Sequence, residues 1–212
     1  IVGGTTYGKG TAQVVLPMDT LPVSNNKTYE DYVKVTQRKF YRVNGNTTQW
    51  TGVVTDIELP DLYADESYKE KANKSALQPD KSKSGIYQPA PALPVQSLRS
   101  KSEQRVSTNA FFKTINNFNA WMKDYKSGRT IPLQWNSYAV HYKRTMEMFK
   151  ELSDDDHGDM TTLSVTNNGF DRLRINVSTQ HSKENNEAYL KMVKKDITLA
   201  EAYKIMMDWI YK

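Results

Sequence analysis

The stretch Tyr7-Gly8-Lys9-Gly10-Thr11-Ala12-Gln13 sets one lysine between two glycines and runs directly into the apolar residues Val14 to Leu16. Glycine is used where the backbone must adopt a positive φ or approach another group closely. The β-branched and apolar run is too short for a helix and ends before a proline, which is typical of a strand. The stretch therefore predicts a tight turn that leads into a buried strand.

Lys9 is the residue of this stretch that could carry chemistry. A lysine that enters an apolar strand loses solvation, so its pKa falls and its neutral amine can act as a general base. The alternative is an ordinary loop lysine on the surface, which takes part in no reaction. Other parts of the sequence must decide between the two interpretations.

The segment from Gly3 to Lys9 also comes close to a phosphate-binding loop. That motif requires Ser or Thr directly after the lysine, to bind magnesium, and a helix behind it. Gly10 takes the first of these places, and a strand-like run follows. Nucleotide binding is therefore the weakest hypothesis for this chain.

A second stretch favours the general base. It runs through Val35 to Gly45 and Thr47 to Gln49, and it continues from Gly52 to Pro60. Together with Gly8 to Gln13, it resembles the C-terminal processing peptidases, and in particular the bacterial tail-specific protease branch. The family usually has Gly-Val-Thr-Pro-Asp where the last of these blocks begins Gly-Val-Val-Thr-Asp, so that Thr55 replaces the proline.

The resemblance implies roles for two residues. In this family a lysine within a Gly-Lys-Gly-Thr-x-Gln segment activates a serine nucleophile. Lys9 matches that lysine, and Gln13 matches the glutamine that helps to orient it in some members. The family's serine lies upstream of the lysine, on a segment that would precede Ile1, so we expect the chain to be a fragment. Since an amine base needs a hydroxyl to activate, we expect the chain alone to be inactive.

The composition narrows the possible partners and cofactors. The 212 residues include 38% hydrophobic and 25% charged residues, as in ordinary globular proteins, and no cysteine, which excludes disulfides and thiolate sites. The net charge of +5 is spread over the whole chain, whereas nucleic-acid binding usually needs a concentrated basic face. No apolar run is long enough to cross a bilayer, and no signal peptide opens the sequence. We expect no cofactor, no nucleic-acid partner and no transmembrane segment in this chain.

The fold class expected from these patterns is α+β, in three segments. Residues 1–60 would form the C-terminal part of a mixed α/β peptidase core, with strands and a hairpin. Residues 61–106 would form a linker or strap, because four prolines lie among serines and lysines in residues 78–105. Residues 107–212 would form a mainly α-helical C-terminal domain with one β-hairpin.

Within the first two segments, the patterns predict particular elements. Residues 17–31 are typical of a loop, and Tyr32 to Val43 shows the alternation of a strand. Asn44-Gly45 favours a type I′ hairpin turn, with a returning strand from Thr47 to Val54. Residues 61–73 could form a short helix.

The third segment carries helical periodicity. Helices are predicted over 107–126, capped by Asn109 or Ser107, and over 136–152, 183–195 and 199–211. Thr198-Leu199-Ala200-Glu201 matches a capping box for the last of these. Residues 161–178 instead alternate around Asn168-Gly169, which predicts the β-hairpin of this domain.

One acidic segment, residues 153–159, combines carboxylates with a histidine. Its spacing fits neither a calcium loop nor a zinc site, so a solvated loop between helices is the better interpretation and no metal site is predicted.

Two functional hypotheses of different classes remain. The first, which the resemblance implies, is a tail-specific serine endopeptidase of the bacterial periplasm, with Lys9 and Gln13 as its catalytic residues in this chain. Its partners would be protein or peptide substrates recognised at their C-termini, and the helical domain would dock an adaptor or another subunit. Attachment to the membrane through the segment before Ile1 stays open. The second hypothesis is a binding or scaffold module, in which the helical domain is the functional part and the peptidase-like part is inert.

Overall fold

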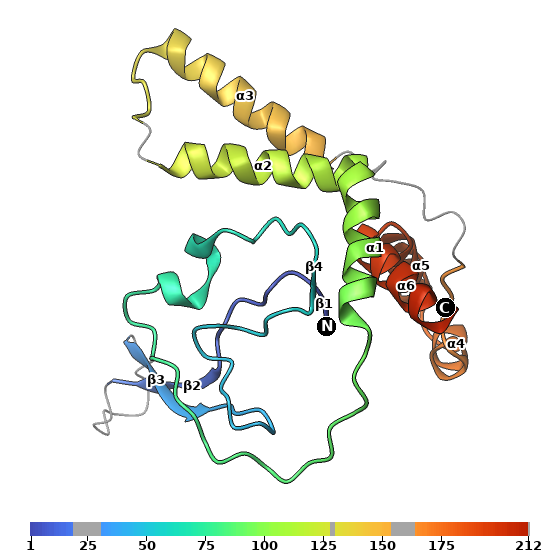
Figure 1. The fold of residues 1–212 in the computed structure, drawn as a ribbon. Helices are drawn as coiled ribbons and strands as arrows, with labels where there is room; N and C mark the ends of the chain where they lie inside the picture. Colours follow the sequence, from blue (N-terminus) through green and yellow to red (C-terminus); the bar gives the residue numbers. More distant parts are fainter. Residues whose placement is uncertain (19–30, 128–129, 154–163, 212) are drawn as a thin grey trace. The chain divides into compact units, whose positions relative to one another are not determined.

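A computed structural model describes residues 1–18, 31–127, 130–153 and 164–211 of the chain. The chain divides into two compact units. The helical unit consists of residues 1–4, 56–62 and 93–212, and the strand unit consists of residues 5–55 and 63–92. The helices and strands of both units are labelled in Figure 1.

The strand unit is built on one antiparallel pair. Strand β2, Thr11–Pro17, pairs with β3, Tyr32–Lys39, and the register shifts between Ala12 and Gln13. The hairpin of the predicted core therefore joins β2 to β3. Within the connection between the two strands, residues 19–30 lie outside the described residues.

The returning strand predicted from Thr47 to Val54 is wrong, because this segment forms turns with only isolated bridges. The type I′ turn at Asn44-Gly45 is wrong as well, since only Gly45 has a positive φ, of 78°. The Gly45 N–H donates to the Arg42 carbonyl at 2.8 Å, and the Asn44 side chain accepts from the Asn46 N–H. The side chain of Asn44 thus stabilises a wider turn in which one positive φ is enough.

The segment after the strands has little regular structure, but it is attached to the turn at 42–46. The Ser82 N–H donates to the Gly45 carbonyl at 2.8 Å, and the Gly85 N–H donates to the Val43 carbonyl at 2.6 Å. Ile86, the apolar residue that follows Gly85, is fully exposed. Backbone hydrogen bonds, and not apolar side chains, therefore hold this part of the segment. The helix expected over 61–73 consists of two short 3₁₀ turns, η1 (Glu66–Tyr68) and η2 (Glu70–Ala72).

The helical unit contains one short parallel strand pair, β1 (Val2–Gly3) with β4 (Ile57–Glu58). Ile57 and Leu59 point to the same face, because side chains alternate along an extended chain. Ile57 packs with Leu98 and Ile205, and Leu59 packs with Phe112 and Ile115. The β4 segment therefore provides buried apolar side chains that pack against three helices of this unit.

The structure shows six helices in the described part of the helical unit. They are α1 (Val95–Thr108), α2 (Ala110–Lys126), α3 (Trp135–Ser153), α4 (Gly169–Asn176), α5 (Gln180–Lys194) and α6 (Ile197–Ile210). Helices α2, α3, α5 and α6 confirm the predicted helices, with ends that differ by a few residues. Asn109 caps α2 as predicted, since its side chain accepts from the N–H groups of Phe111 and Phe112.

Three predictions for this unit are wrong. Helix α1 begins at Val95, inside the segment expected to be irregular, because the proline-rich composition ends at Pro94. Residues 169–176 form α4 instead of the second arm of a hairpin, since the Asn168 side chain accepts from the Asp171 N–H at 2.9 Å and caps a helix. The capping box at Thr198 is wrong, because Asp196 caps α6 two residues earlier in the sequence.

The α+β class predicted from the sequence is confirmed, with a small strand content and mainly helical structure. In the helical unit, α2 and α3 form a helical hairpin (Figure 1). Phe118 of α2 packs edge-on against Phe149 of α3, with ring centroids 5.6 Å apart. None of the helices described is long and apolar enough to span a membrane. The acidic segment 154–159 lies outside the described residues.

Candidate active site

The Lys9 turn, residues 7–10, lies in the strand unit directly before β2. Gly8 and Gly10 are buried on either side of Lys9, and Gly8 has a φ of +97°. The Gly8 carbonyl accepts from the Trp50 N–H at 2.7 Å, and the Gly10 carbonyl accepts from the Phe40 N–H at 2.8 Å. The backbone is therefore held immediately before and immediately after the lysine.

Both glycines are required by close backbone contact. A Cβ atom on Gly10 would lie 2.3 Å from the Gln49 backbone nitrogen, and one on Gly8 would lie 2.9 Å from the Trp50 carbonyl oxygen. Side chains essentially never approach backbone this closely, so larger residues would push the 48–52 segment away. The Gly-Lys-Gly pattern thus has a structural reason in this chain.

Gln49 is the side chain that fixes the turn from within. It is completely buried, and its Oε1 accepts from the Gly10 N–H at 2.7 Å. Its Nε2 donates to Glu70 Oε1 and to the Leu77 carbonyl, both at 3.1 Å. A buried amide is stable only when its donors and acceptors are satisfied, and here they are.

Glu70 joins this group from the start of η2. Its side chain is 5% exposed, and its N–H donates to the Tyr7 carbonyl at 2.8 Å. Desolvation raises the pKa of Tyr7 above its ordinary value, and the hydrogen-bonding influence and charge of the nearby Glu70 carboxylate raise it further.

The position of Lys9 differs from the one expected. Its side chain is exposed, and β2 is not the buried strand that the sequence predicted, since Val15 is 55% and Leu16 is 44% exposed. Among the residues that the structure describes, the Lys9 ammonium has no hydrogen-bond or ion-pair partner. The structure thus fixes the backbone of Lys9 and leaves its amine open to a group outside these residues, while its role as general base stays a prediction.

Gln13, the second predicted site residue, lies on β2 just after the register shift. It is exposed, and its Nε2 lies 3.4 Å from the Thr36 hydroxyl on β3. Within the described part of the chain, no hydrogen bond joins Gln13 to Lys9. Its orienting role also stays a prediction.

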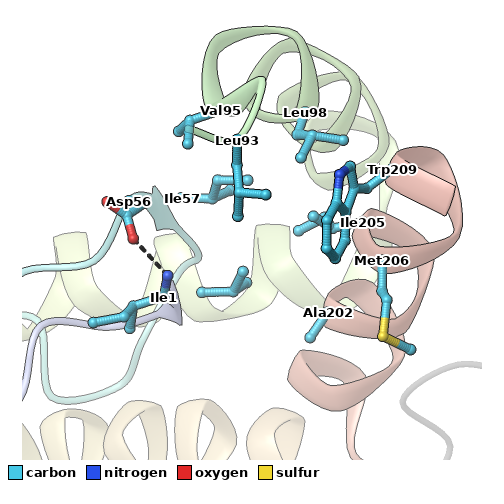
Figure 2. A pocket seen from close by; sticks show the side chains of 11 residues that line it. Ile1, Asp56, Ile57, Leu93, Val95, Leu98, Ala202, Ile205, Met206 and Trp209 are labelled. Atoms are coloured by element: carbon cyan, nitrogen blue, oxygen red, sulfur yellow. Dashed lines mark hydrogen bonds and ion pairs between the residues drawn. The ribbon is translucent and has the colours of Figure 1, made fainter. Parts of the chain in front are cut away.

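The helical unit contains an apolar pocket of about 180 Å³, shown in Figure 2. Leu98 of α1 and Ile205 and Trp209 of α6 contribute to its wall. Asp56, at its edge, is paired with the amino group of Ile1. Neither Lys9 nor Gln13 lines this pocket.

Sequence reasoning missed the Gln49 and Glu70 pair. Gln49 lay within the resemblance, but nothing in the sequence indicated that its side chain would turn inward. Glu70 lies 61 positions after Lys9 in a charged segment, and such segments are usually solvated. Only the fold brings the two residues to the Lys9 turn.

Comparisons with known proteins define the class of this chain. The sequence model of a family described as the C-terminal domain of tail specific protease matches residues 63–211. A tail-specific protease of Haemophilus influenzae is 36% identical over 93 residues, which cover 41% of this chain and 12% of that protein. The chain belongs to the family of tail-specific protease C-terminal domains. The family match begins after the Lys9 turn, and the chain matches only about an eighth of the length of this curated relative.

Proposed function

We propose that this chain is the C-terminal portion of a tail-specific serine endopeptidase that uses a Ser/Lys dyad, with Lys9 as its general base. One observation carries the proposal. The backbone on both sides of Lys9 is fixed by buried partners, while the amine itself is unpaired among the described residues. A general base needs this combination, because it must be held in place and still be able to reach the proton it removes.

The chemistry assigned to Lys9 is a proton transfer in both directions. Its neutral amine accepts the proton of a serine hydroxyl while the serine oxygen attacks the carbonyl carbon of the peptide bond. The resulting ammonium then donates that proton to the departing amine nitrogen as the C–N bond breaks. Gln13 helps to orient Lys9, and water hydrolyses the acyl-enzyme in a second round of the same transfers.

The remaining parts of the proposal follow from the family resemblance. The serine and the oxyanion-hole donors belong to a segment upstream of the lysine, so the 212-residue chain alone does not cleave peptides. The substrates are proteins recognised at their free C-termini in the bacterial periplasm. The helical unit docks an adaptor or another subunit, which is supported by the exposed aromatic side chains of Trp135 and Tyr142 on α3.

The test uses the full-length protein that carries this chain. Digestion of an unfolded substrate with an apolar C-terminus is compared for wild type and Lys9→Ala, and we expect the variant to lose a factor of about 10² to 10⁴ in rate. Lys34→Ala is the matched control, because Lys34 is an exposed lysine of the same unit on β3. We expect this control to cleave at the wild-type rate.

Cleavage by the folded Lys9→Ala protein at the wild-type rate would overturn the assignment of the base. Turnover of the same substrate by the isolated 212-residue chain would overturn the claim that the nucleophile lies elsewhere. A circular dichroism spectrum of each variant shows whether it is folded.

A further inference from the structure

Gln49 and Glu70 are two of the most deeply buried polar side chains among the described residues, and both contact the Lys9 turn. Gln49 is 0% and Glu70 is 5% exposed. Burying a carboxylate is unfavourable unless other groups hydrogen-bond to it, so a buried glutamate in a small unit requires a reason. The hydrogen-bond partners of Gln49 and Glu70 indicate this reason.

The two residues form a bridge that reaches both sides of Lys9. On one side, Gln49 Oε1 accepts from the Gly10 N–H at 2.7 Å. On the other, the Tyr7 carbonyl accepts from the Glu70 N–H at 2.8 Å. The bond from Gln49 Nε2 to Glu70 Oε1, at 3.1 Å, closes the bridge.

Only an amide makes all three hydrogen bonds of Gln49. The side chain must accept from the Gly10 N–H and donate to both Glu70 and the Leu77 carbonyl. A carboxylate cannot donate these two hydrogen bonds, and an apolar side chain makes none of the three. The next residue, Trp50, has a φ of +75°, an unfavourable conformation for an aromatic residue. The Trp50 N–H donates to the Gly8 carbonyl in this conformation, so the backbone is strained at the contact that holds the turn.

We propose that the bridge of Tyr7, Glu70 and Gln49 is the positioning device of Lys9, which sets where its amine lies relative to the reacting hydroxyl. This inference rests on the proposed function, since it assigns Gln49 and Glu70 as positioning residues for that reaction. In this proposal, neither the Gln49 nor the Glu70 side chain takes part in the reaction itself. They act by fixing the backbone on either side of the lysine, where a shift of about 1 Å can lower a rate about 100-fold.

The first test is Gln49→Met in the full-length protein, because methionine has a similar length and neither donates nor accepts in the same way. We expect kcat to fall about 10- to 100-fold while KM changes less than about twofold, since the substrate contacts are untouched. Ile115→Ala is the stability control. It removes buried apolar volume in the helical unit, lowers the melting temperature, and leaves kcat unchanged.

The second test exchanges the two side chains. Gln49→Glu alone places two carboxylates against each other, so we expect a loss of kcat at least as large as that of Gln49→Met. Gln49→Glu combined with Glu70→Gln restores one amide and one carboxylate, so the amide at position 70 can donate to the carboxylate at position 49, which still accepts from the Gly10 N–H. Only the Leu77 carbonyl stays without its donor. We expect the exchanged protein to recover kcat at least fivefold over Gln49→Glu.

The outcomes separate this inference from the proposed function. If Lys9→Ala is inactive but Gln49→Met keeps the wild-type kcat, the bridge is not a positioning device and the base assignment stands. If Lys9→Ala is active, the proposed function fails, and the inference fails with it. If Gln49→Met does not fold, the exchange decides: recovery of kcat supports the inference, and no recovery overturns it.

Discussion

At the scale of single residues, the helical unit depends on a partly buried ion network between α1 and α6. Arg105 Nε donates to Glu201 at 2.9 Å, and Arg105 Nη1 donates to Asp208 at 2.7 Å. The Glu201 side chain is only 4% exposed, and that of Asp208 is 22% exposed. Lys101 adds a further contact to Asp208 at 3.5 Å. The network crosses about a hundred residues of sequence, so no local pattern could have predicted it.

Removing Arg105 should destabilise the helical unit strongly. Arg105→Met leaves the Glu201 carboxylate buried without its cation, so we expect the free energy of unfolding to fall by about 3 to 5 kcal/mol. Arg105→Met with Glu201→Leu should lose less than the single variant, because no buried charge is left unpaired. Urea unfolding measures the free energy of unfolding of both variants. Arg172→Met, at an exposed position of α4, is the control, and its free energy of unfolding should stay within about 0.5 kcal/mol of wild type. A double variant that is less stable than Arg105→Met would contradict this account.

The same network predicts a dependence of stability on pH. Burial would raise the pKa of Asp208, but the hydrogen bonds and charges of Arg105 and Lys101 outweigh it and hold the pKa below its ordinary value of 3.8. A carboxyl with a lower pKa in the folded protein stabilises the fold above pH 3.8 and loses this contribution as the pH falls through the folded pKa. The destabilisation by Asp208→Asn should therefore be smaller at pH 3 than at pH 6.

Urea unfolding at the two pH values checks this prediction. Glu103→Gln is the control, since Glu103 is exposed on α1, and its small effect should be the same at both. An effect of Asp208→Asn that does not change with pH would show that Arg105 does not hold this carboxylate.

At the scale of elements, two asparagine caps show why one helix was predicted correctly from the sequence and another was missed. Asn109 was predicted as a cap because a strong helical stripe follows it, and the structure confirms it. Asn168 was interpreted as a hairpin turn because Asn-Gly favours a type I′ turn and the apolar residues around it alternate. Asp171, three residues later, was the missed signal, since Asn168 accepts from its N–H and donates to its carboxylate at 2.8 Å.

The two asparagine caps should differ in their effect on stability. Asn109→Ala weakens α2, which carries the buried residues Phe112, Ile115 and Phe118, so we expect a loss of about 1 kcal/mol and a melting temperature about 2 to 4 °C lower. Asn168→Ala weakens α4, which has no buried residue, so we expect faster amide exchange over 169–176 and no change in the melting temperature. Asn116→Ala, at an exposed position within α2, is the control.

A global loss of stability in Asn168→Ala would contradict this description of α4. Slow exchange of the 169–176 amides in that variant would also contradict it, because the cap would then contribute nothing to the helix.

At the scale of the whole molecule, sequence reasoning succeeded where periodicity was strong and failed where contacts are distant. The α+β class and four of the helices followed from apolar stripes. The pairing of β3 with β2 could not be predicted in this way, because residues 18–31 separate the two strands in the sequence. The nearer Asn44-Gly45 pair favoured a different partner strand for β3. The catalytic roles predicted for Lys9 and Gln13 came from the family resemblance. Neither the resemblance nor the periodicity of the sequence predicted the bridge of Gln49 and Glu70.

In the proposed function, this chain is the lysine half of a Ser/Lys protease. The family membership covers residues 63–211, and the Lys9 turn lies before them. The geometry of the turn supports a base, since its backbone is fixed and its amine is unpaired among the described residues. In the proposed function, the partner of that amine is a serine hydroxyl.

The most direct measurement is therefore covalent labelling of the full-length protein with a fluorophosphonate, followed by mapping of the adduct by mass spectrometry. The account predicts one labelled serine that lies outside these 212 residues, and a labelling rate that falls at least 100-fold in Lys9→Ala but not in Lys34→Ala. An adduct on a serine within this chain, or a rate unchanged by Lys9→Ala in a folded protein, would contradict it.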